Sequence, residues 1–276
     1  MCVYIGFDWK IVGPDVGNVD YVAWQCDQDA YASSGQKCSA QSILFIHENW
    51  KNSGLLQKIQ ENAETRCLDN LTVGPTLTVN NNEFKDHVKN LLSISGSRLL
   101  FGGDEIEGHS IPSIYGSMKP TAIFVPLEQL LKEEYFDICT TEIFAPFQVV
   151  TEYNDSTLED ILKACEGMSH HLTAAVVSNN VLFQNKILSR TVNGTTYTGR
   201  RARTTGAPQN HWFGPCGDVR GCGIGTPEAI KFVWSLHRYV INIWKIRNSS
   251  LISSCFLREI ITDSSVPDEW CQPAAS

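Results

Sequence analysis

Short apolar runs alternate along the chain with longer segments whose apolar residues recur at helical spacing. Runs rich in β-branched and aromatic residues predict strands at residues 42–47, 98–101, 121–126, 147–152, 172–178 and 195–198. Apolar residues at helical spacing predict helices at residues 53–67, 83–94, 157–168, 180–188 and 227–234. This alternation is typical of an α/β fold in which at least some strands pair in parallel.

Two of these helices have start signals in the sequence. Ser156 and Glu159 have the spacing of a capping box, in which each side chain bonds to the backbone N–H of the other residue. Thr226 before Pro227 is a capping residue followed by proline at the first helical position. Beyond the last predicted helix the apolar periodicity weakens. We therefore expect residues 1–236 to fold and residues 237–276 to form a poorly ordered tail.

The composition is that of a globular protein with an acidic balance. The 276 residues, of which 42% are hydrophobic, suffice for one large domain or two small ones. A formal net charge of -8 disfavours nucleic acid as a partner, because such binding relies on lysine and arginine. We interpret the basic cluster of Arg200, Arg201 and Arg203 as local ion pairing. No stretch approaches the roughly 20 apolar residues of a membrane span, so no membrane contact is expected.

Ten cysteines are dispersed along the chain without a C-x-x-C pair. Because no secretory signal pattern opens the sequence, we expect free thiols in a reducing compartment. Cys216 and Cys222 lack the paired ligands that zinc requires, and His170 and His171 are expected to lead into a strand, so no metal site is predicted. The glycines of residues 214–225 do not follow the dinucleotide-binding fingerprint, and no phosphate-binding loop motif occurs.

Cys38 stands in a context that can support chemistry. It follows Gly35 at the end of a predicted helix and precedes the predicted strand at residues 42–47. A lone cysteine is more often a packed apolar residue than a nucleophile, since reactivity requires a stabilised, accessible thiolate. A second motif, Glu142-Ile143-Phe144-Ala145-Pro146, follows just over a hundred residues later, after a turn-like run at 137–141 and before a strand. Alone, the cysteine motif does not distinguish a nucleophile from a packed residue.

The two motifs resemble those of the aldehyde dehydrogenase superfamily. The segment 35–38, Gly-Gln-Lys-Cys, is similar to the family's active-site cysteine motif, and residues 142–146 are similar to its E-I-F-G-P motif with Ala145 in place of glycine. Residues 27–31 and 193–228 resemble the plant type of 1-pyrroline-5-carboxylate dehydrogenase, and the likeness spans nearly all of residues 6–236. The resemblance implies an α/β catalytic domain with three layers, a mostly parallel sheet and flanking helices.

The resemblance also implies site roles. Cys38 would attack the aldehyde carbon as a thiolate and carry a thioester until water releases the acid. Glu142 would hydrogen-bond the nicotinamide-side ribose of NAD, and Phe144 would pack near the nicotinamide ring. The alternatives for these two residues are a surface carboxylate and a core aromatic side chain.

The implied substrate, L-glutamate 5-semialdehyde, carries a carboxylate that a selective site must hold. Backbone N–H groups of a glycine-rich loop can bind such an anion. The residues implied in substrate binding are Ser39 as a hydroxyl donor, Phe213 in the aldehyde tunnel, and Gly221, Cys222 and Gly223 as the carboxylate anchor. Cys222 replaces the alanine expected there. An alternative is that the glycines only allow tight turns.

Parts of the family pattern are not found in this sequence. Val3 stands at the position where the family has its general-base glutamate. Asp8 is near that position in sequence but does not align with it. The cofactor-binding domain and any mitochondrial transit segment would lie upstream of Met1, so we expect a fragment that is inactive alone. The family is homo-oligomeric, but the divergent tail makes assembly doubtful, because it stands where the family's oligomerisation strand would follow.

Two functional hypotheses follow, with a third that is less favoured. In the first, the chain belongs to an NAD-dependent enzyme of the mitochondrial matrix that oxidises L-glutamate 5-semialdehyde to glutamate in proline catabolism. In the second, it is a non-catalytic truncated family member that only associates with intact subunits. A cysteine hydrolase built on Cys38 is the third, and it lacks an assigned base partner.

Overall fold

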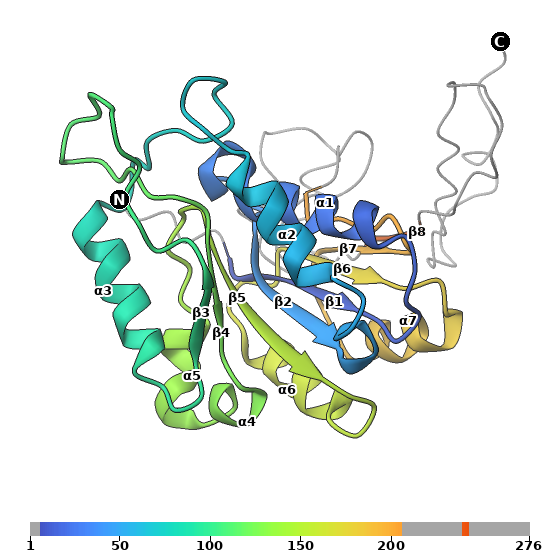
Figure 1. Ribbon diagram of the computed structural model, residues 1–276. Coiled ribbons are helices and arrows are strands. Elements are labelled where there is room, and N and C mark those ends of the chain that lie inside the picture. Colours follow the sequence, from blue (N-terminus) through green and yellow to red (C-terminus); the bar gives the residue numbers. More distant parts are fainter. Residues whose placement is uncertain (1–5, 206–238, 243–276) are drawn as a thin grey trace, which may run out of the picture.

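The computed structural model describes residues 6–205 and 239–242, which form one sheet with helices on both faces (Figure 1). The strand order is β3-β4-β5-β2-β1-β6-β7-β8. Every neighbouring pair is parallel except β3 and β4, which are antiparallel. The strands are β1 (Asp8–Val12), β2 (Gln41–His47), β3 (Arg98–Phe101), β4 (Thr121–Phe124), β5 (Phe147–Tyr153), β6 (Thr173–Val177), β7 (Thr195–Thr198) and β8 (Tyr239–Asn242). The expected α/β fold with a mostly parallel sheet is confirmed.

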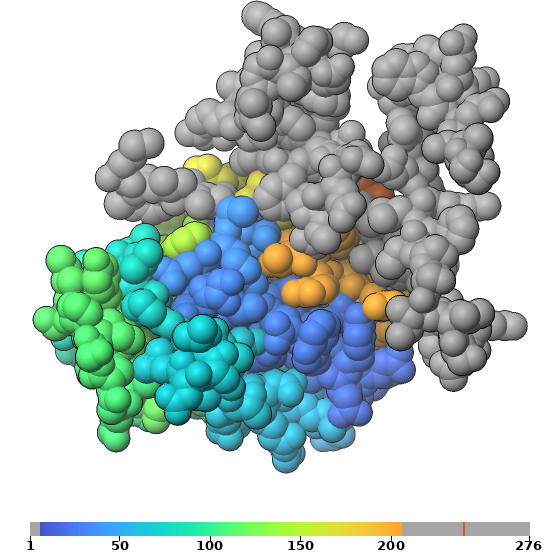
Figure 2. Space-filling view, turned by 90° about the horizontal axis from the view of Figure 1, so that it is seen from above, coloured from blue at the N-terminus to red at the C-terminus, as the bar shows by residue number. Residues whose placement is uncertain are grey.

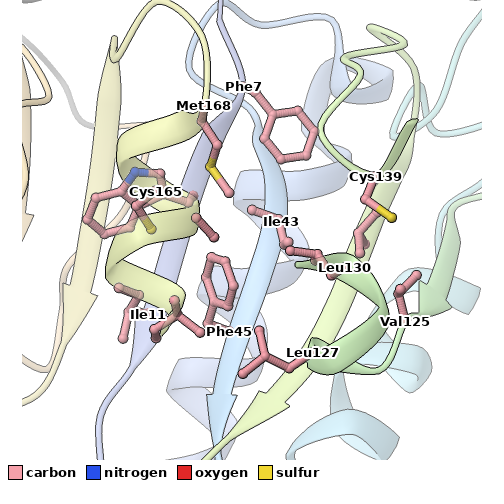
Figure 3. Close-up of a cluster of buried hydrophobic side chains, with 14 of the residues drawn as sticks. Phe7, Ile11, Ile43, Phe45, Val125, Leu127, Leu130, Cys139, Cys165 and Met168 are labelled. Atoms are coloured by element: carbon pink, nitrogen blue, oxygen red, sulfur yellow. The ribbon is translucent and has the colours of Figure 1, made fainter. Parts of the chain in front are cut away.

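The helices divide between the two faces of the sheet because successive strand residues point to opposite faces. On β2, Ile43 and Phe45 pack with α3 to α7, whereas Leu44 and Ile46 pack with α1 and α2. Figure 3 shows part of the first cluster between the sheet and the helices α4 and α6. The helices are α1 (Val19–Tyr31), α2 (Leu55–Glu64), α3 (Asn81–Leu92), α4 (Leu127–Leu130), α5 (Glu133–Cys139), α6 (Leu158–Gly167) and α7 (Val181–Leu188), with the 3-10 turns η1 (Ala32–Gly35) and η2 (Glu48–Trp50).

Most predicted elements agree with the structure, with bounds that differ by a few residues. Strands β3 and β7 match their predictions, but β1 was not among the predicted strands. The run 137–141, predicted as a turn, contains the end of α5. No helix among the described residues is long and apolar enough to cross a membrane.

The predicted capping box of α6 is wrong. The helix begins after Thr157, whose side chain makes no cap bond. Instead the Asn154 side chain accepts hydrogen bonds from the backbone N–H groups of Ser156 and Thr157, so a turn precedes the helix. A capping box does occur at α3, where the Asn80 and Glu83 side chains bond reciprocally to the two backbone N–H groups.

Strand β8 lies within the segment expected to form the tail. Tyr239–Asn242 pairs in parallel with Thr195–Thr198 of β7 and extends the sheet. The domain boundary at residue 236 and the poor order of the tail remain predictions. The rest of that segment lies outside the described residues, as does the predicted helix at 227–234.

Candidate active site

Cys38 lies at the edge of the sheet where the parallel strands begin, which we call the amino edge. It occupies the loop between η1 and β2, and Glu142 occupies the loop that leads into β5, the neighbour of β2. Because β2 and β5 run in parallel, the segments before them meet at this edge. Open α/β sheets more commonly bind ligands at the carboxyl ends of their strands, so this placement is specific to the fold.

A tight left-handed turn precedes Cys38 and contacts the second motif. Ser33, Ser34 and Gly35 have φ values of 56, 55 and 68°. A Cβ atom on Gly35 would lie 2.1 Å from the carbonyl oxygen of Ala145, so only glycine fits there. The glycine of the cysteine motif and the backbone of residues 142–146 are therefore packed against each other, although about 110 residues separate them in sequence.

The residues on either side of Cys38 are anchored to other elements. The Lys37 ammonium donates to the carbonyl oxygens of Gln28 and Asp29, at 2.8 and 3.1 Å, in the last turn of α1. A cation in this position interacts favourably with the negative end of the helix dipole, and burial lowers the pKa of Lys37 to about 8. The Ser39 hydroxyl donates to the Thr205 hydroxyl at 3.2 Å, and Thr205 donates to the Ser39 carbonyl oxygen at 3.0 Å.

The electrostatic surroundings oppose thiolate formation at Cys38. Its side chain is half-buried, and desolvation by burial is the largest cause that raises its pKa above the usual value. The negative charges of Asp8 and Glu142 raise the pKa further, whereas hydrogen bonds from the backbone N–H groups of Cys38 and Ser39 lower it. The net effect is a raised pKa of Cys38. The described part of the chain therefore does not supply the cationic partner that activates many catalytic cysteines.

Glu142 and Phe144 occupy the same edge as Cys38. The Glu142 carboxylate accepts a hydrogen bond from the backbone N–H of Gly6 at 3.3 Å, and its side chain is half-buried. Phe144 has a φ of 47°, an uncommon conformation for an aromatic residue, and its carbonyl oxygen accepts a bond from the Thr78 hydroxyl at 3.5 Å. Such left-handed residues persist where the surroundings fix them.

The structure thus brings four of the predicted site residues to one edge of the sheet, namely Cys38, Ser39, Glu142 and Phe144. The remaining predicted site residues lie outside the described residues, as does Val3; they are Phe213, Gly221, Cys222 and Gly223. The carboxylate anchor and the aldehyde tunnel therefore remain predictions.

Asp8 is a buried carboxyl group that the sequence reasoning did not place in the site. It begins β1 at the amino edge and has no exposed surface. Its Oδ1 accepts a bond from the backbone N–H of Thr173 at 2.7 Å, and its Oδ2 is buried without a hydrogen-bond partner. Burial, and then the negative charge of Glu142, raise the pKa of Asp8 well above 3.8. The sequence signal that could have identified Asp8 as a buried carboxyl group is its position at the start of an apolar segment.

A buried ionic network holds the segment that contacts Ser39. The Asp29 carboxylate accepts bonds from the Lys10 ammonium at 2.8 Å, the Arg203 guanidinium at 2.9 Å and the Thr204 backbone N–H at 2.8 Å. Lys10 and Asp29 have no exposed side-chain surface. The network joins β1 to α1 and to residues 203 and 204. Figure 2 shows the orange end of the first described segment next to blue residues from the start of the chain.

The interpretation of the basic cluster as local ion pairing is confirmed for two of its arginines. Arg200 pairs with Asp15 at 2.6 Å, and Arg203 pairs with Asp29 at 2.9 Å. The Arg201 guanidinium lies over the ring of Tyr21, with 5.3 Å from Cζ to the ring centroid. These contacts fix residues 200–203 against α1 and the loop before it.

Neither of two cavities in the described part of the chain is lined by Cys38. The larger measures about 990 Å³ and lies between residues 63–75, the 101–111 loop and residues 119–120. A cavity of about 260 Å³ lies closer to the predicted site and is lined by Gly6, Glu142 and His170 among others. Glu142 also lines a small pocket of about 10 Å³ together with Gly35 and Phe144, so both of these spaces adjoin the predicted site. His170 and His171 directly precede β6, and no cluster of metal-ligating side chains occurs in the part of the chain that the structure describes.

Comparison with known proteins identifies the family. The profile described as "Aldehyde dehydrogenase family" matches residues 6–239. The chain belongs to the aldehyde dehydrogenase family. It is 64% identical over 236 residues to a "Probable aldehyde dehydrogenase" of Linum usitatissimum. It is 62% identical over 237 residues to "Delta-1-pyrroline-5-carboxylate dehydrogenase 12A1, mitochondrial" of Arabidopsis thaliana. Each match covers 86% of this chain and 43% of the relative, so this aldehyde dehydrogenase chain spans less than half the length of these relatives.

Solved structures share the fold of this aldehyde dehydrogenase chain. A 1-pyrroline-5-carboxylate dehydrogenase from Thermus with bound NAD matches with a TM-score of 0.60 at 24% identity, over 76% of this chain and 38% of that one. A glyceraldehyde-3-phosphate dehydrogenase from Methanocaldococcus jannaschii complexed with NADP matches with a TM-score of 0.60 at 16% identity, over 75% of this chain and 42% of that one. At these identities the likeness concerns the fold.

Proposed function

We propose that this chain carries the catalytic cysteine of an NAD-dependent dehydrogenase that oxidises L-glutamate 5-semialdehyde to glutamate in proline catabolism. The observation that carries the proposal is the packing of Gly35 against the Ala145 backbone, which joins the cysteine motif to the second family motif at one edge of the sheet. The substrate is proposed from the 62% identity to the Arabidopsis relative, whose name is that of a 1-pyrroline-5-carboxylate dehydrogenase.

In the proposed reaction the Cys38 sulfur forms a bond to the aldehyde carbon, and the carbonyl oxygen becomes an oxyanion. The backbone N–H groups of Cys38 and Ser39, which lower the pKa of the thiol, are suited to stabilise that charge. Loss of hydride from the same carbon leaves a thioester on Cys38. Water then breaks the C–S bond, which releases the carboxylic acid and restores the thiol.

The residues present fit one part of a nicotinamide cofactor. A half-buried carboxylate such as Glu142, held by the Gly6 N–H, can accept a bond from a ribose hydroxyl. Phe144 stands two residues further along and would pack against the nicotinamide ring. NAD, when bound, supplies the hydride acceptor for the oxidation. Glu142 and Phe144 would therefore orient the cofactor relative to Cys38.

The location and the assembly are also proposals. The Arabidopsis relative is named as mitochondrial, which supports the mitochondrial matrix as the site of action. The substrate would be a small aldehyde. Because the family is homo-oligomeric, the proposed partner is a second copy of the chain. The sheet continues to Asn242 through the parallel pairing of β8 with β7.

A non-catalytic role is the second candidate, and one observation favours it. The pKa of Cys38 is raised by burial and by two carboxylates, which lowers the thiolate fraction at neutral pH. If the pKa of Cys38 stays raised, its sulfur is a poor nucleophile at neutral pH. The chain could then act only by association with intact subunits.

A chimera tests the proposed function. Residues 6–239 would replace the matching segment of the Arabidopsis relative, and NADH formation would be followed with NAD and pyrroline-5-carboxylate. We expect activity in the chimera and its loss in a Cys38→Ser variant. An inactive chimera that folds and binds NAD would contradict the catalytic proposal and favour the non-catalytic one.

A further inference from the structure

Two side chains of the turn before Cys38 are bonded to a distant loop segment. The Ser34 hydroxyl donates to the Gly74 carbonyl oxygen at 3.1 Å and accepts from the Gly74 N–H at 2.7 Å. The Gln36 amide donates to the Pro75 carbonyl oxygen at 2.9 Å and accepts from the Leu77 N–H at 2.8 Å. Both side chains therefore use a donor and an acceptor on the same short backbone segment, residues 74–77. We call these four bonds the clasp.

The clasp holds a backbone conformation that is costly by itself. Ser33 and Ser34 are non-glycine residues with φ values of 56 and 55°, and L-residues favour the left-handed region only where other contacts fix it. The turn also packs against the Ala145 carbonyl oxygen, which leaves no room for a Cβ on Gly35. The turn is thus fixed between residues 74–77 and the second family motif.

Cys38 follows this turn directly, so its orientation depends on the turn. Lys37, which lies between the turn and Cys38, is anchored to α1, and Ser39, which follows Cys38, is anchored to Thr205. These anchors hold the neighbours of Cys38 but do not reach Ser33, Ser34 or Gly35. In the part of the chain that the structure describes, the side-chain bonds from Ser34 and Gln36 to residues 74–77 hold the turn itself.

We infer that Ser34 and Gln36 are positioning residues for Cys38, acting through the clasp to residues 74–77. The inference rests on the proposed function in so far as Cys38 is taken to be the nucleophile. Neither side chain is assigned contact with substrate or cofactor. Loss of the clasp releases the left-handed turn, and the half-buried thiol of Cys38 then becomes more accessible to solvent.

Site-resolved alkylation of the full chain tests the inference. Iodoacetamide labelling of each cysteine would be followed by peptide mass spectrometry across a pH series. The variants are Gln36→Ala and Ser34→Ala, because alanine keeps the Cβ and the backbone cost of serine at a φ of 55° and so isolates the loss of the hydroxyl. The matched control is Gln57→Ala, which removes an exposed side-chain bond to Glu61 on α2.

Each clasp variant removes two hydrogen bonds, and we expect the Cys38 alkylation rate to rise by at least about fivefold, the factor that corresponds to the loss of one such bond at about 1 kcal/mol. The midpoint of the pH profile should fall, because exposure relieves the desolvation that raises the thiol pKa. The control should match the wild type. A role in general folding would instead expose the three buried thiols together; these are Cys26, Cys139 and Cys165.

Two outcomes would overturn the inference. In the first, both clasp variants have the same Cys38 alkylation rate and the same pH midpoint as the wild type. The other is simultaneous labelling of all the buried cysteines, which would make Ser34 and Gln36 ordinary contributors to stability. Failure of the proposed function would appear in a different measurement, either as a folded chimera that binds NAD but forms no NADH, or as NADH formation that survives Cys38→Ser.

Discussion

Gly35 and Ala145 define the contact on which the site depends, because a Cβ on Gly35 would lie 2.1 Å from the Ala145 carbonyl oxygen. Gly35 begins the cysteine motif and Ala145 lies within the second motif, in the loops that enter β2 and β5. Parallel pairing of these two strands places the loops side by side. The position of Cys38 relative to Glu142 is therefore set by sheet register and by the absence of one side chain.

The Gly35→Ala variant should be strongly destabilised. Alanine at a φ of 68° costs about 1–2 kcal/mol for its backbone, and the contact with a backbone carbonyl adds about 1–3 kcal/mol. Gly54→Ala is the matched control, since Gly54 has a φ of 78° and an added Cβ there meets nothing within 4 Å. Urea unfolding of both variants gives the comparison, and equal losses would refute the steric account.

The Asp29→Ala variant should lose much of the stability of the domain. It leaves the buried Lys10 ammonium without its partner and also removes bonds from Arg203 and Thr204. Breaking a buried pair in this way costs about 3–5 kcal/mol. The control is Asp20→Ala, whose exposed pair with Lys58 should leave the unfolding midpoint almost unchanged. Similar midpoints for the two variants would mean that the buried network contributes little.

Asp8→Asn should reduce the dependence of stability on pH. Burial raises the pKa of Asp8 in the folded chain well above 3.8, so folding favours the protonated carboxyl. Its contribution to stability is fully present below pH 3.8, the usual value, and is lost as the pH rises through the folded-state pKa. Denaturant titrations between about pH 4 and pH 7 should show a smaller decline for the variant than for the wild type. Parallel declines would contradict this assignment.

The same substitution should make Cys38 easier to ionise. The negative charge of Asp8 raises the pKa of Cys38, second only to burial. Its removal should lower the pH midpoint of Cys38 alkylation, with the charge of Glu142 still in place. Asp20→Asn, at an exposed site on α1, serves as the control. A midpoint that stays at the wild-type value would show that Asp8 does not act on the thiol.

The sequence allowed the α/β class and most strands to be predicted, because their β-branched runs are short and bounded by turns. Strand β1 was missed for a physical reason. Its residues are all buried, yet Asp8 and Lys10 alternate with Trp9 and Ile11 and resemble an exposed edge in a one-dimensional pattern. Lys10 is buried only because Asp29, 19 residues away, pairs with it.

The candidate site could be predicted only where short motifs carry it. Cys38 and Glu142 were found through the family resemblance of their motifs. The clasp from Gln36 spans 39–41 residues, and the bonds of Asp29 to Arg203 and Thr204 span 174–175 residues. Contacts of this separation have no local signal, so the supporting side chains became visible only with the fold.

The most direct test of the central claim is mass spectrometry of the chimera quenched in acid during turnover with NAD and pyrroline-5-carboxylate. The account predicts that the peptide containing Cys38 carries a glutamyl group as a thioester, which hydroxylamine removes and which Cys38→Ser abolishes. NADH formation without any acyl group on Cys38 would contradict the claim that this cysteine is the covalent catalyst.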